Sequence, residues 1–482
     1  MKAILDNKWI YFSIALYLIV NAVFTYNEFY WFNLLPGLML IIGISLLSMD
    51  KLFMIIVFFT PLSVNLQDLD FGLGIALPTE PLIFGAMVLF LAKLFFENDY
   101  DVKVFNHPIS YAILFHLAWM FFTSVTSTMP LVSFKYLLSR MWFVITFFYL
   151  ASQIFRNYAR INSFIWLYIF GFLIVIGYTI VNHYLNGFEK DPAHWVMTPF
   201  YNDHTSYGAL LAMYIPLIFL FFDKKYSQTQ KFFSALVLII FFIAIVLSYT
   251  RAAWVSLIGA FGLFIIYQFR IKLSTLIISG ISVISLFLVF KTEIIMKLEK
   301  NRQDSSQDLG EHVQSISNIS SDASNLERLN RWNCAFRMFA EKPIVGFGPG
   351  TYMFQYAPYQ RSKDLTIIST NAGDLGNAHS EYIGPLAEQG VLGSVAFLII
   401  LITVFYYGSK LYHDLPKSET KTLVLLCLLA LSTYFIHGLL NNFLDTDKAS
   451  VPFWGFIAII TVVDIYHRNQ FKKDEETQSS NF

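Results

Sequence analysis

Residues 232–269 read FFSALVLIIFFIAIVLSYTRAAWVSLIGAFGLFIIYQF, two apolar runs separated by the short polar stretch SYTR. A helix that crosses the hydrocarbon core of a bilayer needs about 20 mainly apolar residues. Each run is close to that length, and Arg251 stands between them with almost no loop. The stretch therefore predicts two membrane-spanning helices joined by a very short connection.

The rest of the chain repeats this pattern. Of its 482 residues, 56% are hydrophobic and only 14% are charged, whereas a soluble domain carries roughly 25% charged residues. We predict an all-α polytopic membrane protein with about 14 transmembrane helices, in a range of about 12 to 14. The predicted spans lie near 9–26, 30–48, 51–66, 80–97, 108–127, 134–155, 161–181, 204–222, 232–249, 252–269, 273–290, 385–408, 421–440 and 451–467.

Lysine and arginine set the orientation, because they gather in the cytoplasmic loops of membrane proteins. One set of loops holds pairs such as Arg156 with Arg160 and Lys224 with Lys225, while the alternate short loops hold almost none. Both termini are therefore predicted in the cytoplasm. The predicted organisation is helices 1–11 in residues 1–290, one large extracytoplasmic loop at 291–384, helices 12–14 at 385–467, and a disordered cytoplasmic tail at 468–482.

Composition also argues against several classes of protein. The formal net charge is zero, so the chain lacks the basic footprint of a nucleic-acid-binding protein. Two cysteines do not make a disulfide framework. The pair Asp445 and Asp447 could bind a divalent metal beside a phosphate, but two acids in a loop are a weak signal.

Polar residues gather on the predicted outer side of the membrane. Taken alone, each has an ordinary explanation: Arg251 could reach lipid phosphate from a helix end, Arg328 and His379 could be surface residues, and Arg140 could form a structural ion pair within its span. Besides these four, the outer ends of predicted spans hold Lys135, Asn202 and His204.

Four motifs stand in order between residues 200 and 410: SYTRAAW from 248, ERLNRW from 327, KPIVGFGPGTY from 342 and NAHSEYIGPLAEQGVLG from 377. Together they resemble the signature region of the O-antigen ligases and their relatives, which include O-antigen polymerases and protein O-oligosaccharyltransferases. The spans before and after fit a GT-C-like membrane glycosyltransferase. The combination is moderately specific, and no single motif is.

The resemblance implies a glycan donor on undecaprenyl diphosphate and a hydroxyl acceptor, which is lipid A-core, another glycan or a protein. It implies that Arg251 and Arg328 bind the donor diphosphate and that His379 is catalytic, with no metal and no cofactor. We place Lys135, Arg140, Asn202, His204 and Glu381 as supporting residues. The expected location is the bacterial inner membrane, with the active site facing the periplasm.

The residue types suit this chemistry independently. Arginine guanidinium groups bind phosphate through two parallel hydrogen bonds, which would hold the charge of a leaving diphosphate. A neutral histidine can take the proton of an acceptor hydroxyl. His379 precedes a predicted helix start, whose positive end would disfavour the imidazolium form.

Sequence alone does not separate a ligase from a polymerase or a protein-glycosylating enzyme, because the shape of the cavity decides the acceptor. A transporter is the alternative from another class. Transporters place charges near the midplane and often have inverted repeats. This chain places its polar set at one face and carries a long loop, which argues against transport.

The predicted topology can be tested with alkaline phosphatase, which is active only outside the cytoplasm. A fusion near Ser320 should be active and a fusion near Tyr226 should be inactive, because the Lys and Arg asymmetry puts these positions on opposite sides. Enzyme activity in intact cells is the measurement. The reverse pattern would place the polar cluster on the cytoplasmic side and remove the argument for a lipid-linked donor.

Overall fold

The computed structural model describes residues 7–27, 32, 43, 48–65, 75–96, 100–271, 323–366, 369 and 376–468. The chain divides into two compact units, Met1–Ile55 and Ile56–Phe482. Helix α1 (Asn7–Tyr26) belongs to the first unit, and α3 (Met49–Phe59) spans the boundary. All residues discussed below as parts of a site lie in the second unit.

Ten helices in the described part of the chain are long and apolar enough to cross a membrane. Some continue through short π- or 3-10 turns, so that the spans run Pro130–Ile154, His204–Phe222 and Asp447–His467. The helices at these spans are α4 (Thr79–Phe96), α5 (Pro108–Val125), α6 (Pro130–Val144) with α7 (Ala151–Ile154), α8 (Tyr158–Leu185), α9 (His204–Ile218), α10 (Gln228–Leu247), α11 (Arg251–Gln268), α16 (Gly384–Asp414), α17 (Glu419–His437) and α18 (Asp447–Val462). The predicted all-α polytopic class is confirmed.

Ten of the predicted spans correspond to these ten helices, and α1 covers the predicted span 9–26. The predicted spans 30–48 and 273–290 lie outside the described residues. The prediction of a span at 51–66 is wrong. Helix α3 there has 11 residues and gives way to a 3-10 turn that contains Pro61. An 11-residue helix is about 16 Å long, roughly half of the hydrocarbon thickness.

Strands are confined to one small hairpin among the described residues. β1 (Val64–Asn65) pairs antiparallel with β2 (Ala76–Leu77), with Val64 opposite Leu77. Two further helices, α14 (Ala323–Glu341) and α15 (Tyr352–Gln355), lie outside the spans. α14 contains the ERLNRW motif.

Helix α17 is central to the packing of the spans. It contacts α9, α11, α16 and α18. Of the residues in its most apolar stretch, 83% are buried. Helix α10 instead leaves Phe232, Ile239 and Phe242 exposed, as expected of side chains that face lipid rather than water. The buried helices thus form the interior, and the apolar outer rows are suited to the bilayer.

Helix α16 is broken at Gly390, and the KPIVGFGPG turn docks into the break. Gly390 has a φ of +68°, and the carbonyl groups before it are freed from regular helix bonding. Phe347 N–H donates to Ala387 O at 3.0 Å, and Gly348 N–H donates to Glu388 O at 2.7 Å. Trp119 Nε1 donates to Gln389 O at 2.9 Å. The break therefore serves as the attachment point of the large loop.

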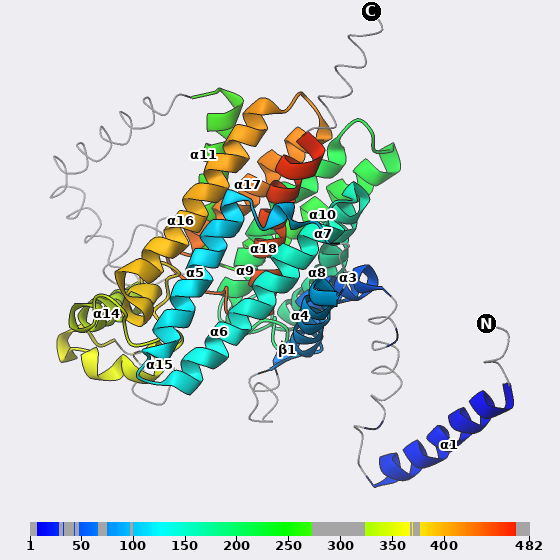
Figure 1. The fold of residues 1–482 in the computed structure, drawn as a ribbon, viewed down its shortest axis with the longest axis horizontal. Coiled ribbons are helices and arrows are strands. Elements are labelled where there is room, and N and C mark those ends of the chain that lie inside the picture. The colour runs from blue at the N-terminus through cyan, green and yellow to red at the C-terminus, as the bar shows by residue number, and fades with distance from the viewer. Residues whose placement is uncertain are drawn as a thin grey trace, which may run out of the picture. The chain divides into compact units, whose positions relative to one another are not determined.

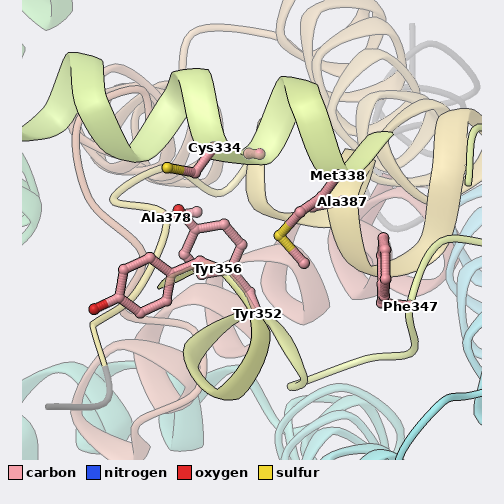
Figure 2. Packing of buried hydrophobic residues seen from close by; sticks show 8 residues of the cluster. Cys334, Met338, Phe347, Tyr352, Tyr356, Ala378 and Ala387 are labelled. Carbon is pink, nitrogen blue, oxygen red and sulfur yellow. The ribbon is translucent and has the colours of Figure 1, made fainter. Parts of the chain in front are cut away.

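A small apolar core holds the described part of that loop together (Figure 2). It joins α14, the 346–350 turn, α15 and the start of α16 through Cys334, Ala335, Met338, Phe347, Tyr352, Tyr356, Ala378 and Ala387. Tyr352 and Tyr356 stack at 5.4 Å between ring centroids. Because Ala378 belongs to this core, the residue after it, His379, is attached to packed structure rather than to a free loop.

We expect Gly390→Ala to release the loop. A side chain at this φ costs about 1–3 kcal/mol, and a Cβ atom would lie 2.1 Å from Ile344 O. Gly177→Ala is the matched control, because a Cβ there meets nothing within 4 Å and alanine favours a helix. The measurement is the thermal unfolding midpoint in detergent, together with tryptic cleavage after Arg337, which lies in the packed helix α14. Equal midpoints and equal cleavage in the two variants would contradict this account.

Candidate active site at one end of the helices

Arg251 lies where two membrane helices begin side by side. It is the first residue of α11, and α9 begins nearby at His204. Thr250 Oγ1 donates to His204 O at 2.7 Å. The helices approach this closely because residue 208 is glycine: a Cβ there would lie 2.7 Å from Thr250 Cβ. The N-termini of two helices therefore meet at Arg251.

Two histidines face each other at the start of α9. The rings of His194 and His204 have centroids 4.2 Å apart, and their Nδ1 atoms are 3.1 Å apart. Asp203 caps α9 through Ser206 N–H at 2.7 Å, and Asn202 beside it is exposed. The charges of both Arg251 and Arg328 act on His204, so the two arginines share one electrostatic neighbourhood.

Arg328 reaches this neighbourhood from α14. Its Nε donates to Leu440 O at 3.2 Å, which ties the loop helix to the 438–446 loop between α17 and α18. Arg331, one turn further, is almost fully buried and pairs with Glu327 at 2.6 Å. Its guanidinium carbon lies 4.0 Å from the centroid of the Tyr356 ring. Arg331 thus fixes α14 on the loop core, while Arg328 points toward the helix ends.

His379 stands in the short segment between that core and α16. Its φ is +50°, an uncommon left-handed conformation for a residue with a side chain, and its N–H donates to Asn377 Oδ1 at 3.0 Å. Burial, followed by the charges of Arg328 and Arg331, lowers the pKa of His379 to about 4. The imidazole is therefore neutral at neutral pH. We expected the positive N-terminus of the following helix to disfavour the imidazolium form of His379. Its influence is less direct than that of burial and the arginines, because α16 begins only at Gly384.

The carboxylate of Glu381 joins the His379 segment to the 438–446 loop. Its Oε1 accepts hydrogen bonds from Tyr434 Oη at 2.6 Å and from the N–H groups of Phe443 and Leu444, both at 2.9 Å. Glu381 N–H in turn donates to Gly438 O at 2.9 Å. Glu381 is 8% exposed. These contacts give it a positioning role.

Lys135 and Arg140 belong to a second group, on α6. Arg140 is buried and donates to Leu444 O at 2.8 Å and to Tyr136 Oη at 2.9 Å. Lys135 is exposed. Both line a pocket of about 470 Å³ that also touches Asn377, Ser380 and Glu381 but not Arg251 or Arg328. The structure therefore separates the candidate residues into an arginine group and a pocket group, with residues 377–381 between them.

The acidic pair in the 438–446 loop region does not form one site. Asp447 accepts from Ser63 Oγ at 2.6 Å and Thr79 Oγ1 at 2.5 Å, and it is buried. Asp445 lines the pocket instead. No group of three His, Cys, Asp or Glu side chains suited to a metal ion occurs within the described residues.

The sequence of this region is similar to that of a known family. Residues 236–398 match the family model of the O-antigen ligases. The match begins in α10 and ends in α16, so it contains Arg251, Arg328 and His379 together with the docked turn. The resemblance to the O-antigen ligase family predicted from the motifs is thereby confirmed over this part of the chain.

A relative from Haemophilus influenzae, named only as an uncharacterized protein, is 25% identical over 249 residues. The alignment covers 48% of this chain and 56% of the relative. The alignment therefore spans little more than half of that protein's length, and the name of the relative gives no activity. The O-antigen ligase match remains the comparison that bears on function.

Sequence reasoning missed Arg331 and the 438–446 loop. Arg331 follows Arg328 by three residues on one helix, so the two side chains were bound to lie on neighbouring parts of the helix surface. That spacing was a usable signal. The loop contributes mostly backbone groups, Gly438 O, Leu440 O, Leu444 O and the N–H groups of Phe443 and Leu444. Contacts made by backbone groups cannot be recognised from the types of residue in the sequence.

Proposed function

We propose that this protein moves a glycan from undecaprenyl diphosphate to a hydroxyl acceptor, lipid A-core or a similar anchor, at the periplasmic face of the inner membrane. The observation that carries the proposal is the charge of Arg328, which acts on His379 and, together with the charge of Arg251, on His204 at the start of α9. Arg251, Arg328 and His379 come from three separate elements within the region that matches the O-antigen ligases.

The arginine group suits the donor diphosphate. Guanidinium groups bind phosphate oxygens with planar, bidentate geometry and stay charged at any physiological pH. The adjoining start of α11 adds to this, because helix N-termini favour anions, and its Thr250 side chain makes no cap hydrogen bond there. The loop helix α14 and the membrane helix α11 would each supply one arginine to the same leaving group.

His379 suits the acceptor. In the proposed step the acceptor oxygen attacks the anomeric carbon, its proton passes to a neutral ring nitrogen of His379, and the bond from that carbon to the diphosphate oxygen breaks. Undecaprenyl diphosphate leaves with the electron pair, held by the arginines. A pKa of about 4 makes a weak base. The negative diphosphate would raise this pKa, because it offsets the guanidinium charges that lower it.

Deletion of the gene followed by complementation tests the function. Cells that lack the protein should lose polymer on lipid A and accumulate lipid-linked polymer. Wild-type protein should restore it, and His379→Ala should not, since loss of a general base costs about 10²–10⁴ in rate. His413→Ala, which changes an exposed histidine near the far end of α16, is the control and should restore it. The measurement is gel analysis of lipopolysaccharide and lipid-linked glycan.

Other outcomes have definite meanings. Single repeat units on lipid A would indicate a polymerase, and unchanged surface glycan would remove the proposal. A pH profile of the purified enzyme separates a base from a structural histidine. Because the neutral form persists down to about pH 4, kcat/KM should stay level well below the ordinary histidine pKa of about 6.5. An acid limb near pH 6.5 would contradict the site as described.

Substitution of the arginines tests whether Arg251 and Arg328 bind the same donor diphosphate. Arg251→Lys and Arg328→Lys keep the charge but lose the planar group, so each should weaken binding of undecaprenyl diphosphate by roughly 10- to 100-fold, since a hydrogen bond to a charged group contributes about 1.5–3 kcal/mol. The double variant should be worse than either, with a measurable coupling energy. Binding to purified protein in detergent is the measurement.

Arg337→Lys provides the control on the same loop helix, because Arg337 pairs with Asp364 at 2.6 Å and lies away from the arginine group. It should bind the donor lipid like the wild type. If Arg328→Lys also binds like the wild type, α14 takes no part in the donor site.

A further inference from the structure

An apolar groove lies between α8 and α10, at the end of the helices opposite Arg251. Helix α10 runs from Gln228 to Leu247, which lies shortly before Arg251, and its 20 residues cover about 30 Å. The groove follows the first turns of α8 and α10, and its volume is about 620 Å³. It is therefore a separate cavity, about one hydrocarbon thickness away from the candidate active site.

Aromatic rings form the wall of this groove. The ring centroid of Trp166 lies 4.5 Å from that of Phe221 and 5.4 Å from that of Phe170. The Phe233 ring follows at 5.6 Å from Trp166. All four residues line the groove, and Phe170 and Phe233 are 41% and 40% exposed. From Asn162 to Phe170 the lining rises about 12 Å along α8, close to the roughly 15 Å of hydrocarbon in one leaflet. The wall thus has the length and the chemistry to take an acyl chain.

Polar side chains beside these rings are engaged within the protein. Asn162 Nδ2 donates to Tyr226 Oη at 3.2 Å. Gln230 Oε1 accepts from Ser227 N–H at 2.9 Å, and Ser234 Oγ donates to Gln230 O at 2.9 Å. Groups that are paired in this way offer little to a sugar or a peptide, whose own polar groups would lose water without gaining partners. The groove is better suited to hydrocarbon.

Basic residues stand where the groove meets the membrane surface. Arg160 is one helical turn before the lining residue Ser163, Lys231 follows the lining residue Gln230, and Lys224 lies in the turn before α10. The asymmetry of Lys and Arg along the chain predicts that this end faces the cytoplasm. Basic pockets between spanning helices on that side bind the head groups of anionic lipids. The charge at this mouth therefore favours an anionic head group.

Two acidic residues reduce this positive charge without cancelling it. Glu419 forms an ion pair with Lys225, a fourth base of the region, and the pair is neutral. Asp223 lies beside them, and its Oδ1 accepts from Lys225 N–H at 3.2 Å. Of the groups named here, three bases and one acid remain, so the mouth of the groove keeps an excess of positive charge. A zwitterionic head group would bring its own cation into this field, whereas an anionic one would not.

We propose that this groove binds one anionic phospholipid of the adjoining leaflet, with an acyl chain on the aromatic wall and the phosphate near Arg160, Lys224 and Lys231. The proposal does not rest on glycan transfer, because none of these residues belongs to the candidate active site. A lipid that binds the folded protein and not the unfolded chain raises the unfolding midpoint. Occupancy of the groove therefore has a consequence that can be measured without any activity.

Lipid titration of the full-length protein in detergent tests the site. The probes are phosphatidylglycerol and phosphatidylcholine with the same acyl chains, and native mass spectrometry counts the bound molecules. One phosphatidylglycerol should bind in preference and should raise the unfolding midpoint more than phosphatidylcholine does. The double variant Lys224→Gln, Lys231→Gln should bind phosphatidylglycerol about 30-fold more weakly, since each lysine near the surface contributes about fivefold. Its binding of phosphatidylcholine should not change. The matched control is Lys410→Gln, Lys417→Gln, which removes two exposed lysines at the same end of the helices.

The aromatic wall has its own pair of variants. Phe233→Ala removes part of the wall and should weaken binding of both lipids roughly tenfold. Phe232→Ala changes the neighbouring residue, which is 73% exposed and does not line the groove, and it should bind both lipids like the wild type.

Equal affinity of the wild type for the two lipids, or an equal loss in the two double lysine variants, would reduce the groove to ordinary boundary lipid and overturn the proposal. A loss in Phe232→Ala as large as that in Phe233→Ala would place the lipid elsewhere and overturn it as well. The lysine variants alter surface side chains and should keep the unfolding midpoint of the lipid-free protein. They decide the question even if Phe233→Ala fails to fold.

Discussion

The hydrogen bonds of the 438–446 loop hold three parts of the candidate site together. Glu381 binds the N–H groups of Phe443 and Leu444, Arg328 binds Leu440 O, and Arg140 binds Leu444 O. Three parts of the sequence that are far apart, α6, α14 and the His379 segment, thus attach to the same stretch of backbone. A non-helical backbone at the edge of a membrane must find partners within the protein, because lipid offers none. Here the partners are charged side chains, whose hydrogen bonds are the strongest available.

This arrangement explains how a long loop can deliver functional groups with defined geometry. The loop is fixed at two places, the break in α16 at Gly390 and the apolar core around Tyr352 and Tyr356. Between these anchors Ala378 is packed and His379 follows it in a left-handed conformation. Helix α14 with α15 and the ends of α5 and α6 gather in one region (Figure 1), in agreement with the bond from Thr128 N–H to Phe347 O at 2.9 Å. The site is assembled from membrane helices and loop together, and neither contains it alone.

The electrostatics of the region divide along the His379 segment. On one side the arginine group and two helix N-termini create a positive environment that burial makes more effective. On the other side the charged groups of Arg140, Glu381 and Glu388 are hydrogen-bonded within the protein. His379 borders both environments, which is where a group that moves a proton between an alcohol and a leaving anion would have to stand.

The sequence by itself determined the class of fold, ten of the spanning helices and the residues around which the site is built. Apolar runs of spanning length report the bilayer directly, and the motifs around Arg251, Arg328 and His379 are local. It failed at 51–66, a 16-residue run interrupted by Pro61, where the helix has only 11 residues and gives way to a 3-10 turn. Only the tertiary structure decided that Lys135, Arg140 and Glu381 belong to a pocket apart from Arg251 and Arg328, and that Arg331 and the 438–446 backbone position the site. These facts depend on which side chains come into contact across the packed helices. Contacts between residues distant in the chain cannot be predicted from the periodicity or composition of any one segment.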